Sequence, residues 1–164
     1  VLELPYIFGA APGRGTLWGF YVKHVRDHDS IPVPGGGTAC VTARQVGLAT
    51  AGACERVDGH RHYSIVDSNV SYSELYRRFA DELGLSRSIR VLSREEALAD
   101  AQRQSEQQLA SGKEHGMNPI GLAELQAIHA HLDPAPAMES LGYGPDDLPM
   151  AIADTVRATV QYSN

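Results

Sequence analysis

The chain has 164 residues, enough for one compact domain or a large part of one. Hydrophobic residues make up 43% of it and charged residues 21%, as in an ordinary globular domain. The formal net charge of -6 argues against a general surface for nucleic acid or anionic membranes, and no apolar run approaches the roughly 20 residues that span a bilayer.

An apolar run over residues 1–8 predicts a buried strand at the start of the chain. The glycine-rich loop GAAPGRG follows, and we expect Thr16 to cap a short helix after it. Ligands of open α/β sheets bind at the carboxyl ends of strands, and glycine allows the backbone to approach them closely. Arg14 offers a planar cation for a carboxylate or phosphate. The loop is therefore either part of a ligand site or a surface turn with a solvated arginine.

Three helix starts are marked by Ser or Thr followed three residues later by Gln or Glu, the spacing of a capping box. They are Thr42, Ser71 and Ser93. The stretch RHYSIVDS predicts a strand between the first two of these helices, and SIRVLS predicts another after the second. IPVPGGG allows at most a short edge strand, because it contains two prolines. Helices and strands thus alternate, which indicates a layered α/β fold.

The remainder of the chain is predicted to be mostly helical. Residues 93–111 are polar and indicate a surface helix, and leucine and isoleucine recur at helical spacing over residues 122–132. The last helix has Pro149 in its first turn, where a missing N–H costs little, and is preceded by Asp146 and Asp147.

The common catalytic motifs are absent from the sequence. No Tyr has a Lys four residues later, and there is no G-x-G-x-x-G, no G-x-x-x-x-G-K and no G-x-S-x-G stretch. We expect Cys40 and Cys54 to be buried free thiols of a reducing compartment.

The histidines do not predict a metal site. His60 and His62 could share one face of a strand, but no third ligand completes a tetrahedral set nearby. His129 and His131 fall on different faces of the expected helix.

Three stretches, in this order, resemble a known family: VLELPYIFGAAPGRGTLW, IPVPGGGTACVTARQVGLATAGACE and HRHYSIVDSNVSYSELYRRFADELG. The resemblance is to the C-terminal half of the extended or atypical short-chain dehydrogenase/reductases, the NAD-dependent epimerase/dehydratase superfamily, and it covers residues 1–92. It implies an α/β fold that is the C-terminal portion of a Rossmann-like protein, with a mostly helical C-terminal region. Residues 1–164 would be one domain or domain fragment, the substrate-binding half. Residues 1–9 would form a late strand of a Rossmann sheet whose N-terminal part is missing.

The same resemblance implies site residues. Those at the nicotinamide end of NAD or NADP would be Pro5, Tyr6 and Gly9. The candidates for substrate contacts are Arg14, Trp18 and Arg44. Glu3 and Ala10 depart from an Arg and a Pro of the family, and Arg44 and Gln45 stand where the family often has two Asp. The family's glycine-rich cofactor loop and its Tyr–Lys pair belong upstream, so no catalytic residue is assigned here.

We therefore expect the substrate-binding part of a bacterial, cytoplasmic NAD(P)-dependent epimerase/dehydratase or reductase, inactive by itself. Its partners would be the missing N-terminal Rossmann half, a small-molecule substrate and a second copy of itself in a homodimer. Two alternatives stay open: a non-catalytic relative that senses a dinucleotide or binds a protein, and a self-sufficient small α/β domain with its own ligand. A Tyr-x-x-x-Lys sequence upstream would favour the enzyme over its non-catalytic relative.

Overall fold

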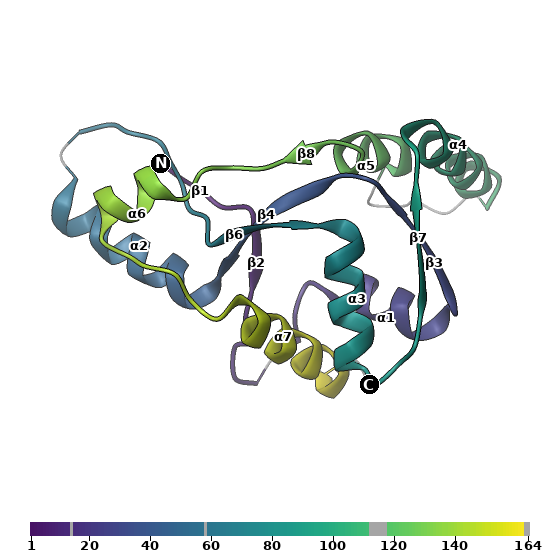
Figure 1. The fold of residues 1–164 in the computed structure, drawn as a ribbon, viewed down its shortest axis with the longest axis horizontal. Coiled ribbons are helices and arrows are strands. Elements are labelled where there is room, and N and C mark those ends of the chain that lie inside the picture. Colours follow the sequence, from purple (N-terminus) through teal and green to yellow (C-terminus); the bar gives the residue numbers. More distant parts are fainter. Residues whose placement is uncertain (14, 58, 112–117, 163–164) are drawn as a thin grey trace.

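The computed structural model describes residues 1–13, 15–57, 59–111 and 118–162, which form a mixed α/β arrangement (Figure 1). The strands are β1 (Leu2–Glu3), β2 (Tyr6–Phe8), β3 (Ser30–Pro34), β4 (Gly37–Thr42), β5 (Tyr63–Ser64), β6 (Ser68–Ser71), β7 (Ser88–Leu92) and β8 (His129–Ala130). The helices are α1 (Gly19–Asp27), α2 (Ala43–Arg56), α3 (Tyr72–Glu82), α4 (Arg94–Ser111), α5 (Pro119–Gln126), α6 (Ala135–Leu141) and α7 (Leu148–Tyr162). No helix in these ranges is long and apolar enough to cross a membrane.

Strand β4 lies at the centre of the fold, and every one of its residues is buried. It pairs in parallel with β2 and β8 and antiparallel with β6. Elsewhere β1 pairs with β5 and β3 with β7, both in parallel. The sequence analysis did not predict β4, because its small and apolar residues lack the alternation of a half-buried strand.

The alternation of side chains along β4 divides the apolar interior into two clusters. Cys40 belongs to the larger cluster, and the neighbouring Val41 belongs to the smaller one. Other buried members of the larger cluster include Phe8, Val25, Ile31, Phe79 and Ile152. Other buried members of the smaller cluster include Ala49, Ile65 and Leu141. Neither cluster includes a residue of α4 or α5. These two helices lie at the opposite end of the molecule from α2 and α6 (Figure 1).

The predicted helix starts are confirmed. Thr42 and Gln45 form a complete capping box, in which each residue's side chain accepts the other's backbone N–H at 3.1 Å. Ser93 and Glu96 form the second complete box, with distances of 3.2 and 2.8 Å. At Ser71 the hydroxyl accepts the N–H three residues on, at 3.2 Å. Each helix thus satisfies free N–H groups of its first turn.

The first part of the chain differs from the prediction in two ways. The expected strand over residues 1–8 is interrupted at Pro5, which has no N–H to donate, and so forms β1 and β2 separately. Thr16 does not cap a helix, which corrects the second expectation. Its hydroxyl accepts the N–H of Trp18 at 3.3 Å and hydrogen-bonds to Thr159 of α7, and α1 begins after this turn.

The helix expected over residues 122–132 ends at Gln126, which is another correction. The carbonyl oxygen of Gln126 accepts the N–H of Gly36, and that of Ile128 accepts the N–H of Gly37, both at 3.1 Å. These carbonyls therefore pair with the start of β4, and the chain continues as β8 instead of another helical turn.

The two cysteines differ in their surroundings. Cys40 is buried, and burial raises the pKa of its thiol to about 12. Cys54 is exposed on α2. The expectation that both thiols are buried is therefore wrong for Cys54, because the apolar face of α2 that packs on the smaller cluster runs through Ala49 and Ala53 and leaves Cys54 outside it.

A buried amide joins several segments near the end of β4. Gln45 is fully buried, and its Nε2 donates to Asp67 Oδ1 at 2.7 Å and to the carbonyl of Gly144 at 2.9 Å. Asp67 Oδ1 also accepts the N–H of Asp146 at 2.9 Å, and the Thr42 hydroxyl donates to Asp146 Oδ2 at 2.7 Å. The start of α2 is thus held to the β5–β6 turn and to the segment that leads into α7.

We expect Gly52 of α2 to be essential for the contact between α2 and α6. A Cβ atom there would lie 1.8 Å from the carbonyl oxygen of Leu141. Gly52→Ala should therefore reduce the free energy of unfolding by about 1–3 kcal/mol or more, because the helices must move apart. Gly47 in the same helix has open space around it, so Gly47→Ala should increase stability by up to about 1 kcal/mol. Urea unfolding of both variants would measure the difference, and equal effects would contradict this packing.

Candidate functional site

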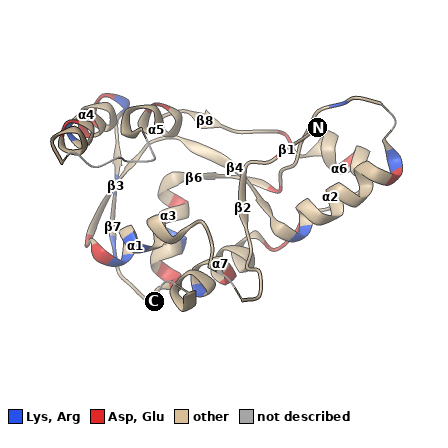
Figure 2. Ribbon diagram, turned by 180° about the vertical axis from the view of Figure 1, so that it is seen from behind, with Lys and Arg blue, Asp and Glu red and all other residues tan. Residues whose placement is uncertain are grey.

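A pocket of about 490 Å³, here called the loop pocket, lies where β2 ends. Its lining residues are Ile7, Gly9, Ala10, Ala11, Gly15, Thr16, Leu17, Trp18 and Ala43. None of these described residues is charged, and β2 is drawn in tan in Figure 2. The loop pocket thus lies at the carboxyl end of a strand, where ligands of open α/β sheets bind.

Gly9 allows the end of β2 to pack tightly. Its φ of 140° lies in the region that favours glycine, and a Cβ atom there would lie 3.0 Å from that of Ala43. Its N–H donates to Thr155 Oγ1 of α7 at 2.7 Å. This N–H therefore holds α7 against β2, and it is not available to a ligand in this arrangement.

Tyr6 and Pro5 lie at the start of β2. The Tyr6 ring is partly buried and packs edge-on against Trp18 and Tyr72, with ring centroids 5.1 and 6.1 Å apart. Burial raises the pKa of the Tyr72 phenol, and the nearby Tyr6 raises it further. Tyr72 therefore stays a neutral hydroxyl at physiological pH.

Trp18 packs against the apolar interior and also lines the loop pocket. Its indole stacks on Phe8, with centroids 4.4 Å apart and planes 17° apart, and its N–H donates to the carbonyl of Ile7 at 3.0 Å. The ring also contacts Tyr21 and Phe79. One side of Trp18 thus belongs to the larger cluster while another lines the loop pocket.

The two predicted cations are not placed in the loop pocket. Arg44 does not line it; its side chain is 69% exposed and forms an ion pair with Asp146 at 3.5 Å. Arg14 lies outside the described residues. Gly9 and Trp18 thus line the loop pocket, Pro5 and Tyr6 do not, and Arg44 lies on the surface of α2.

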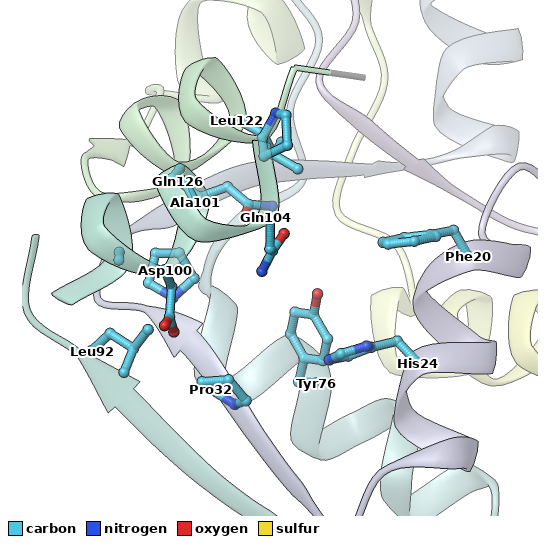
Figure 3. A pocket seen from close by; sticks show the side chains of 14 residues that line it. Phe20, His24, Pro32, Tyr76, Leu92, Asp100, Ala101, Gln104, Leu122 and Gln126 are labelled. Atoms are coloured by element: carbon cyan, nitrogen blue, oxygen red, sulfur yellow. The ribbon is translucent and has the colours of Figure 1, made fainter. Parts of the chain in front are cut away.

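A second pocket of about 150 Å³, here called the inner pocket, lies between α1, α3, β3, α4 and α5 (Figure 3). Its lining residues are Phe20, His24, Pro32, Pro34, Tyr76, Leu92, Ala97, Asp100, Ala101, Gln104, Pro119, Leu122, Ala123 and Gln126. Sequence reasoning missed this pocket, because its walls come from segments far apart in the chain. The one local signal was a glutamine, Gln126, at a position of the helical pattern that packs inward.

The inner pocket is lined by groups that are uncharged near pH 7, with one acidic exception. Burial lowers the pKa of His24, and the neighbouring His28 lowers it further, so the ring is neutral. Burial raises the pKa of the Tyr76 phenol, which keeps its proton. Asp100 is the acidic residue, and it is ion-paired with Arg103. The pocket thus favours an uncharged ligand.

Gln126 lines the inner pocket and carries a donor without a partner among the described residues. The residue is 5% exposed, and its Nε2 makes no hydrogen bond to any described residue. The Gln126 side chain lowers the pKa of the nearby Tyr21 phenol, although burial raises that pKa by more. No hydrogen bond of normal geometry joins the Gln126 amide nitrogen to a described residue. Figure 3 shows Gln104 and Tyr76 pointing toward one another across the cavity beside it.

Within the ranges that the structure describes, no three His, Cys, Asp or Glu side chains are grouped so as to hold a metal ion. His129 and His131 do not lie on a helix as expected; they flank Ala130 in and beyond β8, with ring centroids 5.0 Å apart. His62 bonds instead to Glu3 Oε1 at 3.1 Å.

The sequence matches no protein-family model, and no curated protein matches it. Solved structures match nearly the whole chain. The structure of gox2253 has a TM-score of 0.71 and 16% identity, covering 98% of this chain and 48% of that chain. UDP-glucose 4-epimerase from Thermotoga maritima has a TM-score of 0.62 and 14% identity, with coverage of 98% and 45%. A nucleoside-diphosphate-sugar epimerase from Pseudomonas aeruginosa has a TM-score of 0.61 and 20% identity, with coverage of 98% and 46%.

These matches confirm the predicted fold class. The chain has the α/β fold of the C-terminal half of Rossmann-like epimerase/dehydratase proteins. It spans about half the length of the solved structures that it matches.

Trp18 should contribute mainly to stability. We expect Trp18→Ala to lower the free energy of unfolding by about 3 kcal/mol or more, because the ring packs on Phe8 and Phe79. The control is Leu17→Ala, since Leu17 also lines the loop pocket but is fully exposed. It should change stability by less than about 0.5 kcal/mol. Thermal unfolding compares the two variants, and a Trp18→Ala melting temperature equal to that of Leu17→Ala would rule out the packing role.

Proposed function

We propose that the chain is the substrate-binding C-terminal half of a bacterial, cytoplasmic NAD(P)-dependent epimerase/dehydratase or reductase of the short-chain dehydrogenase/reductase type. The observation that carries the proposal is that 98% of the chain matches about half of several such structures. In this proposal residues 1–9 are a late strand of a Rossmann sheet, and the cofactor-binding half precedes them.

The edge formed by β1 and β2 supports this arrangement. Within the described part of the chain, β1 pairs with β5 alone and β2 with β4 alone, so each has one edge without a strand. Val1, Leu4 and Ile7 are exposed apolar residues along this segment. Unpaired strand edges with apolar side chains normally pair with another strand, and the Rossmann half would supply one.

NAD or NADP would lie against the loop pocket in the complete enzyme. The small residues that line this pocket, including Gly9 and Ala10, leave room for a flat ring, and the absence of charge among them suits the neutral ring of the reduced nicotinamide. When bound, the nicotinamide supplies hydride transfer. Of the three residues proposed for the nicotinamide end, Gly9 lines this pocket, and Pro5 and Tyr6 would contact the cofactor from the preceding part of the same segment.

The substrate would lie between the Rossmann half and this chain. Trp18 offers a flat apolar surface beside the loop pocket, and Arg14 and Arg44 are the cations proposed to meet an anionic part of the substrate. Arg44 would have to leave Asp146 to do so, which costs little because the Arg44 side chain is exposed and the 3.5 Å pair is long. The departures at Glu3, Arg44 and Gln45 leave a non-catalytic relative as the alternative.

We expect the 164-residue chain by itself to turn over no nucleotide sugar, because it contains neither the dinucleotide-binding loop nor an acid–base pair. The longer protein that includes the Rossmann half should bind NAD or NADP. Isothermal titration of both proteins with each dinucleotide, together with a UDP-glucose turnover assay, tests this. Tight dinucleotide binding by the 164-residue chain alone would support a self-sufficient domain instead, and its absence from the longer protein would remove the proposal.

We also expect the chain alone to self-associate through the β1–β2 edge. Leu4→Lys should reduce this association, because a charged residue on an open strand edge opposes pairing. Leu109→Lys is the matched control, since Leu109 is an exposed leucine on α4, far from that edge in sequence and fold. Light scattering over a concentration series measures the change. A monomeric wild-type chain at high concentration, or equal effects of both variants, would count against an open β1–β2 edge that pairs with another strand.

A further inference from the structure

We propose that the inner pocket binds an uncharged, ring-sized group that carries a hydrogen-bond acceptor, such as the carbonyl or hydroxyl oxygen of an aryl or alicyclic compound. The inference goes beyond the proposed function, because the inner pocket shares no lining residue with the loop pocket. The ligand of the inner pocket is a neutral compound, whereas the substrate proposed above has an anionic part.

The size and walls of the inner pocket suit a single ring. Its volume of about 150 Å³ is similar to that of an apolar protein cavity known to hold one benzene molecule. The apolar walls are supplied by Phe20, Pro32, Tyr76, Leu92 and Leu122. Aromatic and aliphatic walls of this kind favour a flat apolar ligand.

The position of Gln126 specifies an acceptor on that ring. The residue lines the inner pocket and is only 5% exposed. Its Nε2 has no hydrogen-bond partner among the described residues. A buried donor without a partner is unfavourable, and a ligand oxygen would satisfy it. The other buried atom in this condition, Nη1 of Arg78, belongs to a residue that pairs with Glu74 and does not line the pocket.

The inner pocket offers no group that would hold a diphosphate. No Lys or Arg is found among its described lining residues, and Asp100, which is acidic, pairs with Arg103. The first N–H groups of α5 could otherwise attract phosphate, but the Asn118 side chain accepts two of them at 3.0 and 3.4 Å. His24 is neutral near pH 7, because burial and then His28 lower its pKa. The negative charge of a nucleotide diphosphate would therefore have no cation among the described lining residues to balance it in this pocket.

Three probes test the inference on the intact protein by nuclear magnetic resonance, with the Gln126 side-chain amide as the reporter. Acetophenone has a ring and an acceptor, ethylbenzene has nearly the same shape without the oxygen, and UDP has the diphosphate. Acetophenone should shift the Gln126 amide signal and bind about tenfold more tightly than ethylbenzene. UDP should leave that signal unchanged.

A substitution separates the hydrogen bond from the shape of the cavity. Gln126→Leu should weaken acetophenone binding about fivefold to tenfold and leave ethylbenzene binding unchanged or stronger. Gln102→Leu is the matched control, because Gln102 is exposed on α4 and does not line the pocket. Unchanged acetophenone binding by Gln126→Leu, or displacement of acetophenone by UDP, overturns the inference. If Gln126→Leu does not fold, the affinity ratio of the two ring compounds on the unchanged protein decides it.

Binding of NAD and NADP, measured separately, distinguishes this inference from the proposed function. Acetophenone binding without dinucleotide binding supports the inner pocket as described and removes the proposed enzyme. Dinucleotide binding together with a shift of the Gln126 amide signal by UDP keeps the proposed enzyme and overturns the neutral ligand of the inner pocket.

Discussion

The buried amide of Gln45 is the interaction on which the arrangement of the rest depends. It completes the cap of α2, and it also fixes Asp67 and the carbonyl of Gly144, which lie in segments distant in sequence. A polar group without exposure must have its partners, so each of these segments has one favourable position relative to α2. Because Asp67 also accepts the N–H of Asp146, the same hydrogen-bond network sets where α7 begins.

The position of α7 in turn shapes the loop pocket. Thr155 on α7 binds the N–H of Gly9, and Thr159 binds the hydroxyl of Thr16, so both ends of the loop are held by one helix. The chain from Thr16 to Trp18 lines the loop pocket, and the following helix, α1, carries Phe20 and His24 to the inner pocket. The two pockets are therefore fixed relative to one another through α1 and α7.

Local patterns in the sequence predicted the local structure well. Thr42, Ser71 and Ser93 act as expected, because a cap depends on residues only a few positions apart. Thr16 did not, because its hydroxyl is taken by Thr159, a partner that no local pattern reveals. The fold class came from the order of three resembling stretches. The inner pocket and β4 could not be predicted, since both are defined by pairing between segments far apart in the chain.

Helices α4 and α5, which form one wall of the inner pocket, are packed differently from the rest of the fold. Ala97 and Ala101 of α4 and Ala123 of α5 are buried, and the two helices pack on each other, but neither belongs to the two apolar clusters around β4. Small side chains bury little area, so separating such a wall from the strands costs less free energy than opening a cluster. The inner pocket is therefore bounded on one side by two helices whose buried side chains are mostly alanines.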